Sequence, residues 1–324
     1  ATSNQMPDIF WMHTNEILKY ADNGMLADCT DIVEKDKFSE ISLSNAMGSN
    51  GTLYAVPKDK DTVGLVYNKE MFDAAGVTYP DENWTWDDLV SASEKIYAAT
   101  GKYGYMAYAD DQLGYWNFVY QAGGYILNEE GQPGLNDPKT IEGVEYNKKF
   151  AALQADGDYN TVTTLFNEGK AAAIIGGPWL VSSIRDAGID FGVASLSDMT
   201  LPNGNPLAPY AGVQGVGVLK TGAEAHPEAI GKVLAALASP EVGVALAKSS
   251  GCAPANSKAY EDPEVAADEL IVAIQKTAET AQPMPNIPEM GVLWGPAESF
   301  LVAVNKSGED VATAAETAQQ AHNA

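Results

Sequence analysis

The residues that most often carry covalent chemistry are few and scattered in this chain. Its three histidines, His13, His226 and His322, stand in no motif that places one of them beside a nucleophile. The Gly-X-Ser-X-Gly turn of the α/β-hydrolases is absent, and the glycines at 212, 215 and 217 match neither phosphate-binding fingerprint. We therefore expect neither acyl transfer nor nucleotide binding.

Carboxylates are abundant, but their spacing defines no metal site. Asp59 and Asp61 alone do not supply the ordered ladder of a calcium loop, and the two cysteines lack zinc-type spacing. Glycoside cleavage needs two acids about 5 to 9 Å apart, for which the candidates are Asp61, Asp110, Asp111 and Glu298. Because acids are so common here, each is more often a solvated charge than a catalytic group. We expect no metal, no cofactor and no enzymatic activity, with a glycoside hydrolase as the enzymatic alternative.

Aromatic side chains outside helical stripes offer a different chemistry, which is stacking on sugar rings. A sugar ring has apolar C–H faces that stack on aromatic rings and hydroxyl groups that pair with Asp, Asn, Gln or His. Seven aromatic residues fall at expected strand ends, turns or helix starts, where open α/β sheets border their ligands: Trp11, Tyr115, Trp116, Tyr159, Trp179, Tyr210 and Trp294. The competing interpretation is that these are ordinary core aromatics.

The elements that must position these residues alternate along the chain. Short β-branched runs and helical patterns follow one another, which predicts an α/β fold with mainly parallel sheets. The expected strands are 8–11, 53–56, 63–67, 103–108, 171–175, 191–194 and 212–219. The clearest helix follows Thr85, with Asp88 completing a capping box. Its apolar stripe, predicted to face the core, is Trp86, Leu89, Val90, Ile96 and Tyr97. Further helices are expected to begin at 137, 227 and 240.

Length and charge narrow the range of partners. A chain of 324 residues usually divides into more than one core. Acids outnumber bases 44 to 19, and the formal charge of -25 disfavours nucleic acid and anionic membrane surfaces. The chain carries neither an apolar run of about 20 residues nor the start of a signal segment, so we expect a soluble, mature form. Cys29 and Cys252 are either two buried thiols or one disulfide bridge.

Four segments are more specific than any spacing. They are PDIFW from Pro7, NGTLYAVPKDKDTVGLVYNKEMF from Asn50, LFNEGKAAAIIGGPW from Leu165 and MPNIPEM from Met284. These segments resemble the family-1 extracellular solute-binding proteins of ATP-binding-cassette sugar importers, and among them most closely the maltose and maltodextrin binders. The resemblance covers essentially the whole chain in order.

This resemblance implies a two-lobed periplasmic-binding-protein-like fold of type II, closing like a hinge around a sugar. Residues 1–62 and 213–265 would form the N-terminal lobe, and residues 63–212 and 266–324 the C-terminal lobe. Family members place a strand, a helix and a second strand before the Pro-Asp-Ile segment, so we expect the N-terminal lobe to lack them here.

The resemblance also implies a function. It predicts a monomeric, extracytoplasmic receptor, periplasmic or lipid-anchored, that captures maltose or maltooligosaccharides between its lobes and delivers them to a membrane permease. The alternatives are a binding protein for a different oligosaccharide or for another small solute, such as a peptide or a polyamine.

Carried over position by position, the resemblance implies nine sugar-binding residues. The stacking aromatics are Tyr159, Trp179 and Trp294, and the polar residues are His13, Asn15, Asp61, Asp111, Gln214 and Glu298. Three positions depart from the pattern of the maltose binders. Met12 stands in place of a tryptophan, Glu298 in place of an arginine, and Asp111 in place of a longer glutamate. The bound sugar could therefore be branched or differently linked.

Overall fold

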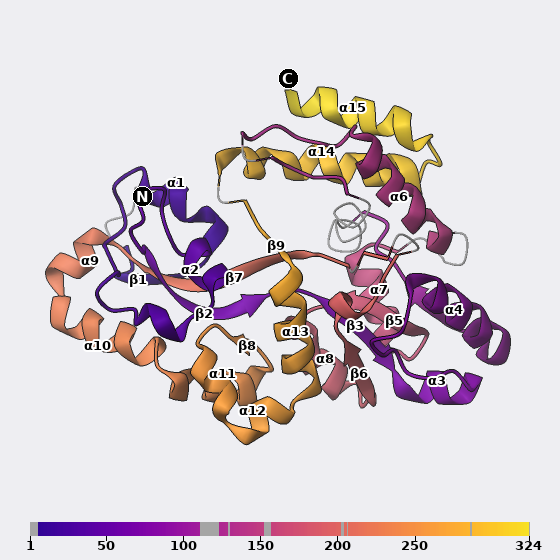
Figure 1. Ribbon diagram of the computed structural model, residues 1–324, viewed down its shortest axis with the longest axis horizontal. Coiled ribbons are helices and arrows are strands. Elements are labelled where there is room, and N and C mark those ends of the chain that lie inside the picture. Colours follow the sequence, from indigo (N-terminus) through magenta and orange to yellow (C-terminus); the bar gives the residue numbers. More distant parts are fainter. Residues whose placement is uncertain are drawn as a thin grey trace. The chain divides into compact units, whose positions relative to one another are not determined.

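The chain folds into two compact units, each with its own sheet and core. The computed structural model describes residues 6–110, 123–128, 130–151, 157–201, 204–205, 207–285 and 287–323. Unit 1 comprises residues 1–61, 211–275 and 283–288, and unit 2 comprises residues 62–210, 276–282 and 289–324. Their elements are labelled in Figure 1. These bounds differ from the expected lobes mainly at residues 266–275, which belong to unit 1.

Unit 1 is built on a sheet with the strand order β1-β7-β2-β8, with β9 also paired to β7. Its strands are β1 (Ile9–His13), β2 (Ala55–Asp61), β7 (Tyr210–Val218, which starts in unit 2), β8 (Ala253–Pro254) and β9 (Gln282–Pro283, at the boundary). Its helices are α1 (Ile17–Ala21), α2 (Glu40–Asn45), α9 (Lys220–Ala225), α10 (Pro227–Leu237), α11 (Pro240–Ser250), α12 (Pro263–Ala267) and α13 (Glu269–Thr280, which ends in unit 2). The prolines that open α10 and α11 confirm the predicted helix starts at 227 and 240.

The core of unit 1 lies between this sheet and its helices. Leu53, Ala55 and Val56 are fully buried, and Ile230 and Leu234 of α10 belong to the same cluster. Both cysteines are buried, free thiols, which selects one of the two alternatives left by the sequence. Among the described residues no single helix is long and apolar enough to cross a membrane; the bent pair α10 and α11 passes on length and composition alone.

Unit 2 has a four-stranded sheet of order β4-β5-β3-β6. Its strands are β3 (Gly64–Asn68), β4 (Tyr103–Met106), β5 (Ala171–Gly176) and β6 (Phe191–Ala194). Its helices are α3 (Lys69–Ala75), α4 (Trp86–Thr100), α6 (Pro138–Ala151), α7 (Tyr159–Asn167), α8 (Val181–Asp186), α14 (Pro288–Asn305) and α15 (Val311–Asn323). The core contains all of β5 up to Ile175, together with Phe72 and Trp86.

Helix α4 shows how the sequence sets a helix start. The Thr85 hydroxyl accepts a hydrogen bond from the backbone N–H of Asp88 (3.2 Å), and Asp88 Oδ2 accepts from the backbone N–H of Thr85 (2.7 Å). The predicted capping box is therefore confirmed. The predicted apolar stripe is only partly correct, because Trp86 and Ile96 are buried but the Tyr97 side chain is 58% exposed.

The prediction of mainly parallel sheets is wrong for the described pairings. Among the strands that the structure describes, only β4 and β5 pair in parallel, whereas β7 runs antiparallel to β1 and β2, and β3 runs antiparallel to β5 and β6. In unit 2 a single reversed strand, β3, produces this pattern, whereas in unit 1 both β7 and β8 run opposite to β1 and β2. Strands β2 and β3 are consecutive along the chain but belong to different sheets, and only residues 62 and 63 separate them, so they do not form a βαβ unit.

Candidate functional site

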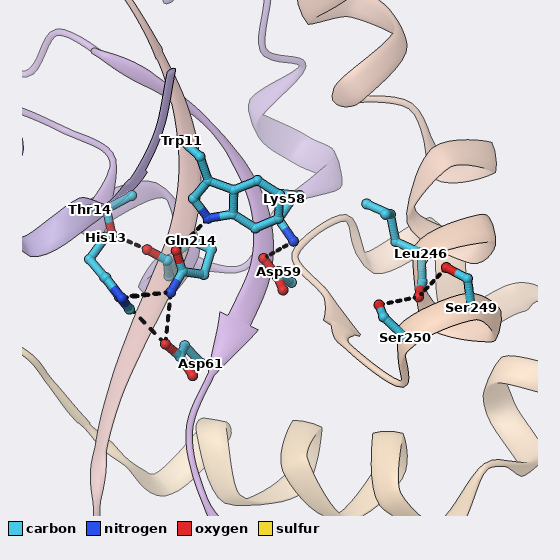
Figure 2. Close-up of polar contacts among 11 residues, drawn as sticks. Trp11, His13, Thr14, Lys58, Asp59, Asp61, Gln214, Leu246, Ser249 and Ser250 are labelled. Carbon is cyan, nitrogen blue, oxygen red and sulfur yellow. Dashed lines mark hydrogen bonds and ion pairs between the residues drawn. The ribbon is translucent and has the colours of Figure 1, made fainter. Parts of the chain in front are cut away.

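One face of the unit 1 sheet carries polar side chains that the sequence predicts to bind sugar. His13 on β1 lies opposite Gln214 on β7, and Gln214 lies opposite Asp59 on β2. Opposed residues of neighbouring strands project from the same face, as do residues two apart in one strand. Trp11 and Asp61 therefore lie on this face as well, as Figure 2 shows.

The carboxamide of Gln214 connects the other side chains of this face. Its Oε1 accepts a hydrogen bond from Trp11 Nε1 (2.6 Å), and its Nε2 donates to Asp61 Oδ2 (3.0 Å). The same Nε2 lies 2.8 Å from His13 Nδ1, which accepts when the ring is neutral and protonated on Nε2. An indole, an imidazole and a carboxylate thus share one surface, which is the combination of stacking and hydroxyl-binding groups that a sugar requires.

A β-bulge in β2 brings Lys58 to Trp11. The register of β2 against β7 shifts between Pro57 and Asp59, so Lys58 is an extra residue in this strand. Lys58 Nζ lies 3.7 Å from the centroid of the Trp11 ring and 2.7 Å from Asp59 Oδ1. Lys58 and Asp59 are buried, whereas Trp11 is 57% exposed. One face of the indole therefore rests on a buried ammonium group.

Burial also changes the ionisation of the acid in this pair. It raises the pKa of Asp59 to about 6, although the neighbouring Lys58 ammonium acts in the opposite direction. Asp61 raises the pKa of Asp59 further, and His13 lowers it, by smaller amounts. At neutral pH the carboxylate is ionised and paired with Lys58.

Met12 does not line this face. It is buried in the core of unit 1, where a Cβ atom on Gly217 would lie 2.8 Å from Met12 Cε. The resemblance places Met12 where the maltose binders have a tryptophan, but side-chain alternation in β1 gives the exposed position to Trp11. Trp11 is one of the seven aromatic residues outside helical stripes but not one of the nine residues that the resemblance implies. Its two-residue spacing from His13 is the signal that could have placed it there.

Trp179 and Tyr159 form a second aromatic group, in unit 2. Trp179 follows β5 in the 3-10 helix Pro178–Leu180, and Tyr159 begins α7, where Asp158 caps the first turn. Trp179 Nε1 donates a hydrogen bond to the Tyr159 hydroxyl (2.7 Å), and the Tyr159 ring stacks on Tyr108 with centroids 5.4 Å apart. Tyr108 is buried and Trp179 is 43% exposed. A chain of aromatic contacts thus ties an exposed indole to the core of unit 2.

The two remaining described site residues lie on α14. Trp294 and Glu298 are four residues apart, so they share one side of the helix, and both are exposed. Pro296 lies between them and removes one backbone hydrogen bond from this turn. At the end of the helix, Asn305 Nδ2 donates to the backbone oxygen of Ala109 (3.0 Å), which attaches α14 to the segment after β4.

Several predicted positions lie outside what the structure describes. Asp111, Tyr115 and Trp116 belong to a segment outside the described residues, and the same is true of the Asn15 side chain. Tyr210, another of the seven aromatic residues expected near a ligand, is buried. Within the described part of the chain, no group of three or more His, Cys, Asp or Glu residues could hold a metal ion.

Comparison with known sequences gives the family. The profile of the bacterial extracellular solute-binding protein family matches residues 1–244. A maltotriose-binding protein of Pyrococcus abyssi is 32% identical over 314 residues, covering 94% of this chain and 67% of the relative. A galactooligosaccharide-binding protein of Bacillus subtilis is 30% identical over 336 residues, covering 97% of this chain and 76% of the relative.

Comparison with solved structures agrees with these matches. The maltose-binding periplasmic protein MalE of Listeria monocytogenes, solved in complex with maltose, superposes with a TM-score of 0.82. It is 27% identical in sequence, and the match covers 98% of this chain and 83% of that protein. The predicted two-lobed α/β fold is thereby confirmed. The chain belongs to the bacterial extracellular solute-binding protein family.

Proposed function

We propose that this protein is the sugar-capturing component of an ATP-binding-cassette importer, with maltose or a short maltooligosaccharide as its ligand. Family membership supports a binding role, and the Pyrococcus relative and the Listeria structure are named for α-glucans. In the chain itself the proposal rests chiefly on Trp179. Its N–H is bonded to Tyr159, so a ligand that approaches its exposed surface meets the ring face, to which the C–H face of a sugar is complementary.

The proposed roles of the individual residues follow from their chemistry. Tyr159, Trp179 and Trp294 stack on sugar rings, and we add Trp11 to this group because its indole is exposed beside His13 and Asp61. The proposed partners of the sugar hydroxyl groups are His13, Asn15, Asp61, Asp111, Gln214 and Glu298.

The remaining parts of the proposal concern location and partners. We place the protein outside the cytoplasmic membrane, periplasmic or lipid-anchored, because its family is extracellular. We propose that it acts as a monomer and passes its sugar to membrane permease subunits. The charge of -25 argues against nucleic acid as a partner.

A galactooligosaccharide is the second candidate ligand. The Bacillus relative named for this sugar is 30% identical, close to the 32% of the maltotriose binder. Stacking aromatics accept both sugars, because both present apolar C–H faces. The choice between a maltooligosaccharide and a galactooligosaccharide then depends on the residues that bind the sugar hydroxyl groups. Two of these, Glu298 and Asp111, depart from the pattern of the maltose binders.

Isothermal titration calorimetry tests the proposal and separates the two ligands. Maltotriose, a galactooligosaccharide and spermidine are titrated separately into the protein, and we expect saturable heat from maltotriose. The melting temperature should rise with maltotriose concentration, because the ligand binds only the folded state. Binding of the galactooligosaccharide alone would select the second candidate, and binding of spermidine alone would refute a sugar site. New reducing ends after incubation with maltotriose would instead indicate a glycoside hydrolase.

A substitution tests whether Trp179 is part of this site. We expect Trp179→Ala to weaken maltotriose binding by about 1 to 3 kcal/mol, as the loss of a large aromatic anchor does. Tyr97→Ala serves as the control, because Tyr97 is an aromatic residue on α4 that is even more exposed than Trp179 and that we do not place in the site. Equal affinities for the wild type and Trp179→Ala would exclude Trp179 from the sugar contacts.

A further inference from the structure

The contact between Trp11 and Lys58 is unusual for an exposed tryptophan, because the cation beneath the ring is buried. Lys58 Nζ lies 3.7 Å from the ring centroid, well within the roughly 6 Å range of a cation–π interaction. The Lys58 side chain is only 5% exposed. Such contacts are stronger when the cation is shielded from water. The indole is therefore held on one face by Lys58 and at its N–H by Gln214.

Two features of Lys58 are uncommon in a regular β-strand: its buried ammonium group and its place in a bulge. The ammonium is removed from water, which is costly unless a counter-charge is near, and Asp59 Oδ1 supplies one at 2.7 Å. The strand also carries an extra residue at Lys58, and bulges of this kind redirect side chains next to binding sites. A buried ion pair and a bulge at the same residue indicate that its placement serves the contact with Trp11.

The neighbouring Lys60 provides an internal comparison. Lys60 is buried on the same strand, and its Nζ also lies near an aromatic ring, that of Tyr260, but at 5.5 Å from the centroid. Tyr260 is not one of the proposed sugar-binding residues. The two lysines thus share strand, burial and chemistry, and only Lys58 contacts the exposed indole.

We propose that Lys58 is a positioning residue for sugar binding: its buried ammonium, anchored by Asp59, fixes the Trp11 indole with its other face toward the ligand. This inference rests on the proposed function, because it takes Trp11 to be a stacking residue. Lys58 itself touches no sugar. It acts by ordering the Trp11 side chain before the sugar binds, so the entropic cost of ordering that side chain does not weaken binding.

Two measurements test this role in the full chain. The first needs no ligand: the indole N–H resonance of Trp11, assigned by its loss in Trp11→Phe, is recorded for Lys58→Met and for the control Lys60→Met. We expect Lys58→Met to shift or broaden this resonance and Lys60→Met to leave it in place. An unchanged Trp11 resonance in Lys58→Met would overturn the inference whether or not the protein binds sugar.

The second measurement is a double-mutant cycle on maltotriose affinity. Lys58→Met should weaken binding about 2- to 10-fold, the range expected for ordering one large side chain on binding. Lys58→Arg, which keeps a cation under the ring, should restore affinity to within about 2-fold of the wild type. In a Trp11→Ala background, Lys58→Met should have no further effect. An equal loss in both backgrounds would show that Lys58 acts independently of Trp11.

The charge left behind in Lys58→Met requires a further variant. If the unpaired Asp59 carboxylate prevents folding, Lys58→Met/Asp59→Asn removes both charges and replaces the single variant in both measurements. If the wild type binds no sugar, the proposed function fails, and the resonance alone decides whether Lys58 positions Trp11.

Discussion

Asp59, the buried acid paired with Lys58, should change the stability of the protein with pH in the direction opposite to that of most acids. Burial raises the pKa of Asp59 from 3.8 to about 6, so the folded protein keeps this proton up to a higher pH than the unfolded chain does. Between pH 3.8 and about 6 the folded state binds more protons, and the contribution of Asp59 to the free energy of unfolding falls as pH rises. A shift of about 2 pKa units corresponds to roughly 3 kcal/mol, which is lost progressively as pH rises through both pKa values and is gone by about pH 7.

The assay compares the wild type with Lys58→Met/Asp59→Asn, which removes the ion pair without leaving a lone charge. Urea unfolding is followed by circular dichroism at pH 4, 5, 6 and 7. On going from pH 4 to pH 7, the wild type should lose roughly 2 kcal/mol relative to the variant, most of the full effect. Acids far from this pair contribute equally to both proteins and cancel in this difference.

Asp28→Asn is the control of opposite sign for this assay. Hydrogen bonds from Thr30 lower the pKa of Asp28, so this acid stabilises the fold above the unfolded pKa and the stability is lost as pH falls. The wild type should therefore gain stability relative to Asp28→Asn as pH rises. Parallel curves for the wild type and the Lys58/Asp59 variant would refute the raised pKa of Asp59.

The remaining predictions concern local packing. A Cβ atom on Gly177 would overlap the Trp179 ring, so Gly177→Ala should displace this half-exposed indole and weaken maltotriose binding, measured by calorimetry, with little change in melting temperature. A Cβ atom on Gly176 would overlap buried Leu180 instead, so Gly176→Ala should lower the melting temperature, and the reverse assignment of the two effects would contradict this geometry. Thr85→Ala should cost about 1 kcal/mol in urea unfolding, because it removes the cap of α4; an unchanged free energy of unfolding would show that the capping box adds nothing.

Strand β2 extends five residues beyond the end that the sequence pattern predicts. The pattern predicts a strand that ends at Val56, because Lys58, Asp59 and Lys60 are residue types that strands normally exclude. The structure continues β2 to Asp61 and buries all three charges. Asp59 pairs with the adjacent Lys58, but the aromatic partners of Lys58 and Lys60 come from β1 and from the region after β8, about 50 to 200 residues away in sequence. A local pattern contains no information about these distant partners.

The sequence correctly predicted those features that depend on residues close together in the chain. The α4 cap depends on two residues three positions apart, and the helix starts at Pro227 and Pro240 depend on one residue each. Tyr97 falls on the periodic stripe yet is exposed, because a stripe gives the direction of a side chain and not the extent of the neighbouring core. The sequence pattern could not predict strand direction either, because the alternation of apolar and polar residues is the same in parallel and antiparallel strands.

The hydrogen bonds of the two exposed tryptophans limit how a sugar can be recognised. Trp11 Nε1 is bonded to Gln214 and Trp179 Nε1 to Tyr159, so each indole offers its ring face and not its N–H. Ring faces distinguish poorly between sugars, because the C–H surfaces of different hexoses are alike. In the proposed site, discrimination between sugars would then come from the polar side chains, which in unit 1 include Asp61 and His13, both in contact with the Gln214 amide. The aromatic residues would thus set affinity, and the network around Gln214 would set which sugar is bound.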